Sequence, residues 1–207
     1  MRLSPVALFF LKVLVWMPVT FALWYYSAEV GLWPVTKLVD GFLSFQIPYA
    51  IQSVTQIGHQ IQVSVYLAVQ ASPAQLPGGS TGEMVLAGKF LVNALKYGYC
   101  IPLFTALLLA TPGHWWRKMK IWLMGMLILQ LAQAWGVSFE VLKVLLFDQG
   151  PEAPGMLGYG FLSLNGVGLA YQFGFLILPA VAPVVIWMAF HTDYLRDLAP
   201  GLGRTLK

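Results

Sequence analysis

Four long stretches of the chain carry almost no charged side chain and are dominated by large apolar residues. They cover about residues 3–27, 91–111, 121–139 and 169–190. A helix of about 20 such residues is long enough to cross the hydrocarbon core of a bilayer. The sequence therefore predicts an α-helical membrane protein with about four transmembrane helices. The third helix is expected to continue outward to residue 147.

The composition supports a membrane protein and argues against several soluble classes. Apolar residues make up 58% of the chain and charged residues 10%, against roughly 45–50% and about 25% in soluble globular proteins. These values exclude a disordered chain, a soluble Rossmann or TIM-barrel enzyme and, despite a net charge of +4, a basic nucleic-acid binder. The single cysteine, Cys100, excludes an intrachain disulfide, and the three histidines form no HxxxH pair. We therefore expect no metal, cofactor or nucleic-acid partner.

The basic residues beside the four stretches predict the orientation of the chain. Segments 1–2, 112–120 and 191–207 carry seven lysines and arginines, whereas the opposite side carries four. Because short cytoplasmic loops are rich in Lys and Arg, both termini and the 112–120 loop are expected in the cytoplasm. Aromatic and basic residues near the span ends are the expected membrane anchors. They are Trp24, Tyr25, Tyr26, Trp115, Trp116, Arg117, Lys118 and Lys120.

Residues 28–92 are expected to form a small α+β module on the outer face, between the first two spans. Pro34 opens a stripe of apolar residues at helical spacing, which predicts an amphipathic helix. The stripe consists of Val35, Leu38, Val39, Phe42 and Leu43. Two placements stay open: the helix lies flat on the outer leaflet, or it packs on the module.

A change of period then predicts strands. Residues 61–69 alternate between apolar and mostly polar side chains, and residues 83–92 are expected to return as the hairpin partner. Between them, 72–82 is rich in Pro, Gly and Ser and is expected to form a loop. The second outer segment, 148–168, contains six glycines, which is typical of a linker or of a shallow re-entrant segment.

Few residues offer catalytic chemistry. Cys100 near the outer end of the second span is a weak candidate nucleophile, with His59 as its base. Lys96 lies one turn earlier, but every arginine is on the predicted cytoplasmic side. We therefore interpret Cys100 as a small packing residue.

Other polar and small residues in the spans are expected to join helices. Gln130 and Gln133 lie three apart in the third span and can bind a substrate or, as we favour, hydrogen-bond to a neighbouring helix. Ala132/Gly136 and Ala170/Gly174 have the small-xxx-small spacing that permits close helix approach. Glu140 and Lys143 are expected to form an ion pair at the outer interface.

Several sequence runs together resemble a known family. The runs are Met1-Arg2-Leu3, Trp24-Tyr25-Tyr26, the stretch from Val92-Asn93-Ala94-Leu95-Lys96-Tyr97-Gly98-Tyr99-Cys100 through Ile101-Pro102-Leu103 to Thr111, and Gln130-Leu131-Ala132-Gln133-Ala134-Trp135-Gly136-Val137. Over most of its length the chain resembles the exosortase H-associated membrane proteins of Gram-negative bacteria. This is a resemblance of overall pattern and carries no catalytic signature.

The resemblance implies a multi-pass inner-membrane accessory protein of a protein-sorting system. An exosortase and its substrate, a protein with a C-terminal sorting signal, are the implied partners. Exosortases themselves use Cys, Arg and His, and this chain lacks the outer arginine, so no catalytic residue is carried over. The matching positions Asn93, Tyr97 and Pro102, with Gln130 and Gln133, are candidates for positioning or partner contact.

Three functions follow as hypotheses. The first is a non-catalytic accessory protein that assists the exosortase or its substrates. The second is a membrane cysteine transpeptidase or protease that uses Cys100 and His59. The third is a small transport or assembly scaffold for exported polysaccharide.

Overall fold

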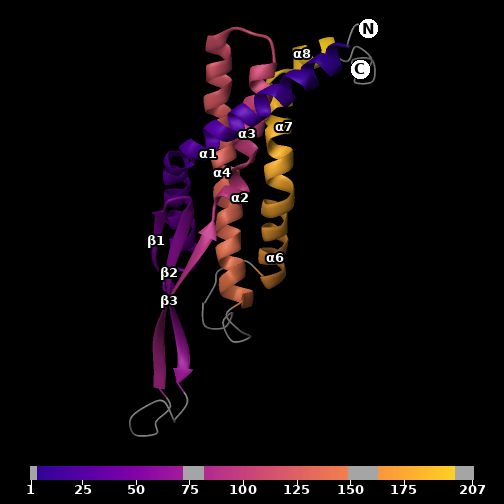
Figure 1. The fold of residues 1–207 in the computed structure, drawn as a ribbon. Coiled ribbons are helices and arrows are strands. Elements are labelled where there is room, and N and C mark those ends of the chain that lie inside the picture. Colours follow the sequence, from indigo (N-terminus) through magenta and orange to yellow (C-terminus); the bar gives the residue numbers. More distant parts are fainter. Residues whose placement is uncertain (1–3, 72–81, 149–162, 199–207) are drawn as a thin grey trace.

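The computed structural model describes residues 4–71, 82–148 and 163–198, with side chains for all of these except 67–71 and 82–87. The described chain is mostly helical and contains one small sheet (Figure 1). The helices are α1 (Pro5–Gln46), α2 (Leu95–Gly98), α3 (Cys100–Ala110), α4 (Trp115–Lys143), η1 (Val144–Asp148), α6 (Leu164–Gln172), η2 (Phe173–Ile177), α7 (Leu178–Phe190) and α8 (Thr192–Leu198), where η marks a π-helical segment. The strands are β1 (Ile51–Ile57), β2 (Gln60–Ala71) and β3 (Gly82–Asn93).

Three helical segments of the described chain are long and apolar enough to cross a membrane. They are Pro5–Gln46, Trp115–Asp148 and Leu164–Phe190, and they contain the first, third and fourth predicted spans. The window of the second predicted span, 91–111, holds the end of β3 followed by the shorter apolar helical segment Leu95–Ala110. A fourth membrane crossing therefore stays a prediction.

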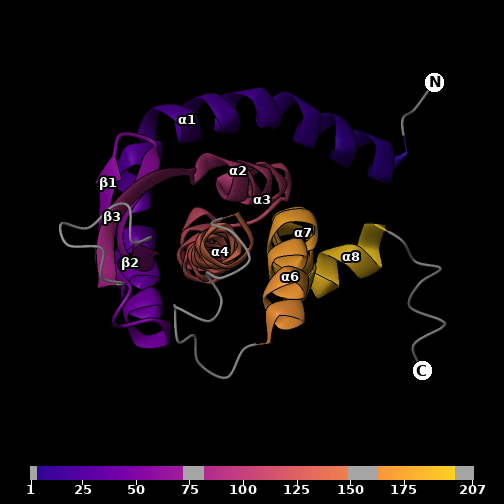
Figure 2. The ribbon, with the colours of Figure 1, turned by 90° about the horizontal axis from the view of Figure 1, so that it is seen from below.

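α1 is a single helix of 42 residues. At this length it extends about 63 Å, twice the ~30 Å thickness of the hydrocarbon core. The prediction that a separate helix begins at Pro34 is wrong, because α1 continues through both Pro18 and Pro34. A proline inside a helix removes one backbone hydrogen bond and tends to kink the helix. Favourable packing of the side chains along α1 can compensate for this cost. Figure 2 shows α1 curving around α2 and α3.

The amphipathic stripe of α1 is buried in protein. Val35, Val39 and Leu43 are each 0% exposed. They pack in one cluster with Ile61 of β2 and Leu142 of α4. The placement flat on the outer leaflet is therefore wrong, and the alternative, packing against the module, is what the structure shows.

Buried apolar side chains form two clusters, which the long helices connect. The sheet core joins the second half of α1, the sheet, α2, the second half of α4, and α6. The bundle core joins the first half of α1, α3, the first half of α4, and α7, with α8 packed on its edge. The start of α1, the α3–α4 turn and α8 lie together at one end of the molecule, and the sheet lies toward the other (Figure 1). Because α1 and α4 run through both cores, residues 28–92 do not form a separate folding unit.

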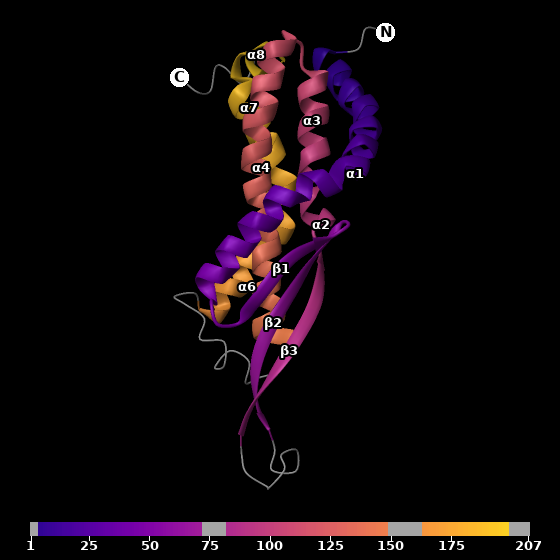
Figure 3. The same cartoon turned by 90° about the vertical axis from the view of Figure 1, so that its left-hand side faces the viewer.

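The sheet is antiparallel, in the order β1-β2-β3. β2 and β3 form the hairpin expected from the alternation, paired from Gln60↔Asn93 to Ala71↔Gly82. β1 pairs with the other edge of β2. β1 was not predicted, because only Val54 among its seven side chains is buried and its apolar pattern is weak. β2 and β3 extend past β1, away from the helices (Figure 3).

Two predicted loops lie mainly outside the described residues. Residues 72–81 of the expected hairpin loop are not described, and neither are residues 149–162 of the glycine-rich segment. The last part of that segment is helical, because α6 begins at Leu164 with Ser163 as its N-cap.

Gly136 of α4 is the point at which three elements meet. A Cβ atom at this position would overlap the Tyr97 ring of α2. A Cβ atom at Gly174 of η2 would lie 3.0 Å from the Gly136 Cα atom. The missing side chains therefore allow α2 and η2 to approach α4 closely, as expected for small-xxx-small positions.

We expect Gly136→Ala to lower the free energy of unfolding by about 1–3 kcal/mol, the usual cost of overpacking a core. Gly41→Ala on α1 is the matched control, because a Cβ atom there meets nothing within 4 Å and alanine favours a helix over glycine by roughly 0.5–1 kcal/mol. Denaturation of both variants in detergent, followed by circular dichroism, measures the difference. Equal free energies of unfolding for the two variants would contradict the close contact between Gly136 and the Tyr97 ring.

Candidate functional site

The short helix α2 is fixed between the sheet and α4 by two polar side chains. The Asn93 side-chain oxygen accepts a hydrogen bond from the Leu95 backbone N–H at 3.1 Å, which starts the helix. Gln133 of α4 is 2% exposed and donates from Nε2 to the Ala94 carbonyl oxygen at 3.0 Å. Gln133 thus joins α4 to the start of α2, whereas Gln130 is half-buried and points to no partner that the structure records.

The next residues of α2 form a partly buried charged cluster with α4. The Lys96 ammonium makes an ion pair with the Glu140 carboxylate, and the two side chains are 34% and 14% exposed. The same ammonium lies 5.4 Å from the centre of the Tyr97 ring and 5.8 Å from that of Phe175 in η2. Such distances allow cation–π attraction. We call Lys96, Tyr97, Glu140 and Phe175 the junction cluster.

Two buried polar atoms of the junction cluster lack a hydrogen-bond partner. They are the Tyr97 hydroxyl and the Glu140 Oε2 atom. Tyr97 is 1% exposed and its neighbours include Glu140 itself. The two groups are complementary, because a tyrosine hydroxyl can donate a hydrogen bond and a carboxylate oxygen can accept one.

The predicted ion pair between Glu140 and Lys143 is wrong. Glu140 faces α2 and pairs with Lys96, whereas the Lys143 ammonium lies 2.7 Å from Asp148. The reason is the π-helical segment η1 after Lys143, which brings residues five apart onto one face. The partner of Glu140 comes from 44 residues away, so sequence spacing on α4 carries no signal for it.

Cys100 and His59 lie in different surroundings. Cys100 is 0% exposed in the bundle core, and its thiol donates to the Tyr97 carbonyl oxygen at 3.4 Å. The His59 ring lies against Tyr25 and 3.6 Å from the Glu29 carboxylate, at the turn between β1 and β2. No hydrogen bond in the described chain joins Cys100 to His59.

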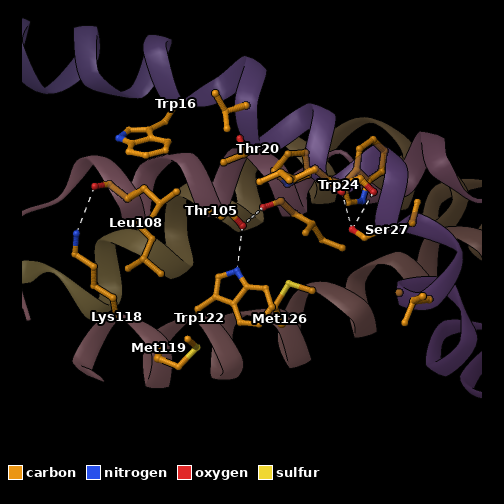
Figure 4. Close-up of a pocket in the computed structure, with 18 of the residues that line it drawn as sticks. Trp16, Thr20, Trp24, Ser27, Thr105, Leu108, Lys118, Met119, Trp122 and Met126 are labelled. Atoms are coloured by element: carbon orange, nitrogen blue, oxygen red, sulfur yellow. Dashed lines mark hydrogen bonds between the residues drawn. The ribbon is translucent and has the colours of Figure 1, made fainter. Parts of the chain in front are cut away.

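An elongated groove lies between α1, α3 and α4, with a volume of about 510 Å³. Figure 4 shows that side chains from all three helices point into it. Gln133 lines the groove near α2, and Lys118 lines it at the other end of α4. Pro102, one of the candidate positions, also lines it, as does the aromatic ring of Trp24.

A small polar network joins two walls of the groove. Trp122 of α4 donates from Nε1 to the Thr105 hydroxyl oxygen of α3 at 3.1 Å, and Thr105 donates to the Ile101 carbonyl oxygen at 2.9 Å (Figure 4). Thr105 and Trp122 were not among the residues predicted from the sequence. Their signal was a lone hydroxyl residue in an otherwise apolar run, and this signal is weak because a threonine often bonds only to its own helix.

The comparison with protein families decides the classification. A family model described as "Exosortase H-associated membrane protein" matches residues 3–194. The chain belongs to this family. No curated protein and no solved structure matches the chain.

The family match covers every described residue except 195–198, so it includes the groove and the junction cluster. It identifies the chain as a membrane protein associated with an exosortase system. The resemblance seen in the sequence is thereby confirmed. In this family member the expected anchors separate into two groups: Trp115, Trp116, Arg117 and Lys120 are exposed at the start of α4, and Tyr25 and Tyr26 are exposed in the middle of α1.

We expect Glu140→Gln to destabilise the protein more than Asp148→Asn. The first change leaves the half-buried Lys96 ammonium without its carboxylate, at a cost of about 1.5–3 kcal/mol. The second removes an ion pair whose side chains are 36% and 46% exposed, and such pairs contribute at most about 1 kcal/mol. Chemical denaturation in detergent measures both values. If Glu140→Gln and Asp148→Asn lower the free energy of unfolding equally, the Lys96–Glu140 ion pair is as exposed to solvent as the Lys143–Asp148 pair, and the junction cluster is not part of the core.

Proposed function

We propose that this protein is a non-catalytic, integral inner-membrane accessory protein of an exosortase-type sorting system. It assists the sorting enzyme or the substrates that carry a C-terminal signal. The observation that carries the proposal is the family match, which extends over residues 3–194 and thus over both cores.

The exposed face of α1 is the surface we assign to the partner. The stripe that attaches α1 to the molecule occupies only one side of the helix, and large apolar side chains cover the rest of its first half. Leu14 is 66% exposed, Phe10 is 62% exposed and Leu11 is 48% exposed, and these three residues share one side of the helix. Within a bilayer such a face contacts lipid or the apolar helix of another protein. An accessory protein for a membrane enzyme needs a face of this kind.

The surroundings of Cys100 support a non-catalytic role. A thiol acts as a nucleophile when it is partly exposed and when a base or positive charge favours its thiolate. Cys100 is 0% exposed among apolar side chains, and its neighbour by hydrogen bond is a backbone carbonyl. These are the surroundings of a packing residue.

Affinity purification from native membranes tests the proposal. We expect a tagged chain to recover an exosortase or a protein with a sorting signal, and Leu11→Ala/Leu14→Ala to reduce that recovery at least about tenfold, because two apolar contacts of the exposed face are lost. Leu127→Ala/Leu131→Ala on α4 is the matched control, since these leucines are 65% and 58% exposed. Recovery of neither class of protein by the unaltered chain would overturn the proposal.

The orientation is a separate proposal, with both termini in the cytoplasm and the sheet on the outer side. In a chain with Cys100→Ala, we expect Tyr49→Cys to react with a membrane-impermeant maleimide added to intact spheroplasts, because Tyr49 is 94% exposed beside the sheet. We expect Lys120→Cys, exposed near the start of α4, to react only after the membrane is permeabilised. The reverse labelling pattern would invert the orientation.

A further inference from the structure

The groove between α1, α3 and α4 extends far along the helices. On α4 its lining runs from Trp115 to Gln133, which corresponds to about 27 Å along the helix. Its walls are almost wholly apolar, as the side chains of Leu23, Leu108 and Met126 illustrate. An apolar channel of this length suits a molecule with a long hydrocarbon chain.

One end of the groove carries a positive charge that no ion pair of the described chain neutralises. Lys118 lines this end, and the hydrogen bond that the structure records for its ammonium is donated to the Leu109 carbonyl oxygen, at 3.4 Å. Lys118 belongs to none of the four ion pairs of the described chain. A partly buried ammonium without a carboxylate partner is complementary to an anion.

The volume of the groove is that of a ligand pocket. Pockets for small molecules and cofactors usually measure about 300–1,000 Å³, and the groove measures about 510 Å³. The groove therefore has room for part of a lipid, such as a hydrocarbon chain.

We propose that this groove binds one anionic glycerophospholipid of the phosphatidylglycerol type. A hydrocarbon chain of the lipid lies along the apolar walls, and its phosphate is held at Lys118. Lys118 stands beside Trp115 and next to the turn that precedes α4, where a phospholipid head group meets the aromatic belt of a membrane protein. This lipid site does not require the proposed role with an exosortase.

Two variants with matched controls test the lipid site. Lys118→Gln removes the charge from the groove, and Lys120→Gln removes a charge two residues away on an exposed side chain that does not line it. Gly31→Leu fills the groove, because Gly31 lines it and a Cβ atom there meets nothing within 4 Å. Gly41→Leu adds the same side chain to α1, also into open space, but away from the groove.

The readout is native mass spectrometry of the purified full chain, delipidated in detergent and titrated with phosphatidylglycerol or phosphatidylethanolamine. We expect one phosphatidylglycerol per chain and weaker binding of phosphatidylethanolamine. We expect Lys118→Gln to weaken phosphatidylglycerol binding about fivefold, since a lysine near a membrane surface contributes about 1 kcal/mol, and Gly31→Leu to abolish binding of both lipids.

The site would be overturned if each variant bound lipid as its control does, or if the two lipids bound equally to the unaltered chain. Thermal unfolding of each variant separates these outcomes from a loss of fold, and Lys118→Gln, a change on the polar end of a helix, keeps the test valid if Gly31→Leu fails to fold. Because only the purified chain and lipid are present, the result does not depend on whether an exosortase binds.

Discussion

The close contact at Gly136 is the constraint on which the rest of the structure depends. With no side chain at this position, the Tyr97 ring packs directly on the α4 backbone, and Gly174 of η2 approaches from another side. α2 is thereby held against α4, which brings Lys96 to Glu140 and Gln133 to the Ala94 carbonyl. A side chain at position 136 would move α2 away from α4. The Lys96–Glu140 ion pair and the hydrogen bond from Gln133 to Ala94 would then be lengthened or broken.

The position of α2 also links the two cores. α2 follows β3 and leads directly into α3, so the place where it is fixed sets both the position of the sheet and the position of one wall of the groove. α1 provides a second link, since its buried stripe continues from Phe9 in the bundle core to Leu43 in the sheet core. The positions of the sheet and the groove therefore depend on each other, although the two lie in different halves of the molecule.

The sequence predicted those features that depend on neighbouring residues and missed those that depend on distant ones. Charge-free windows located the long helices, and period-two alternation located β2 and β3, because both signals are local. The course of α1 beyond Pro34 was missed, because the burial of Val35 and Val39 against the sheet outweighs the helix-breaking tendency of proline. The partner of Glu140 and the groove were missed for the same reason: Lys96 and Glu140, like the three groove walls, come together only through packing between residues that are distant in the sequence. Asn93, Tyr97 and Pro102 were selected by resemblance and Gln133 as a polar residue inside a span, and the structure places all four beside the groove or the junction cluster.

The two proposed binding surfaces use opposite sides of α1. Leu14, which we assign to the protein partner, is 66% exposed and does not line the groove. Trp16, Val19 and Thr20 face the groove from the same helix.

A lipid chain in the groove would fill the space between α1 and the pair α3 and α4. It would restrict the motion of α1, because an empty apolar groove leaves its walls without packing partners. A partner that binds the outer face of α1 would then meet a fixed helix and lose less conformational freedom on binding. Lipid occupancy and partner affinity are thus expected to rise together, although neither ligand touches the other.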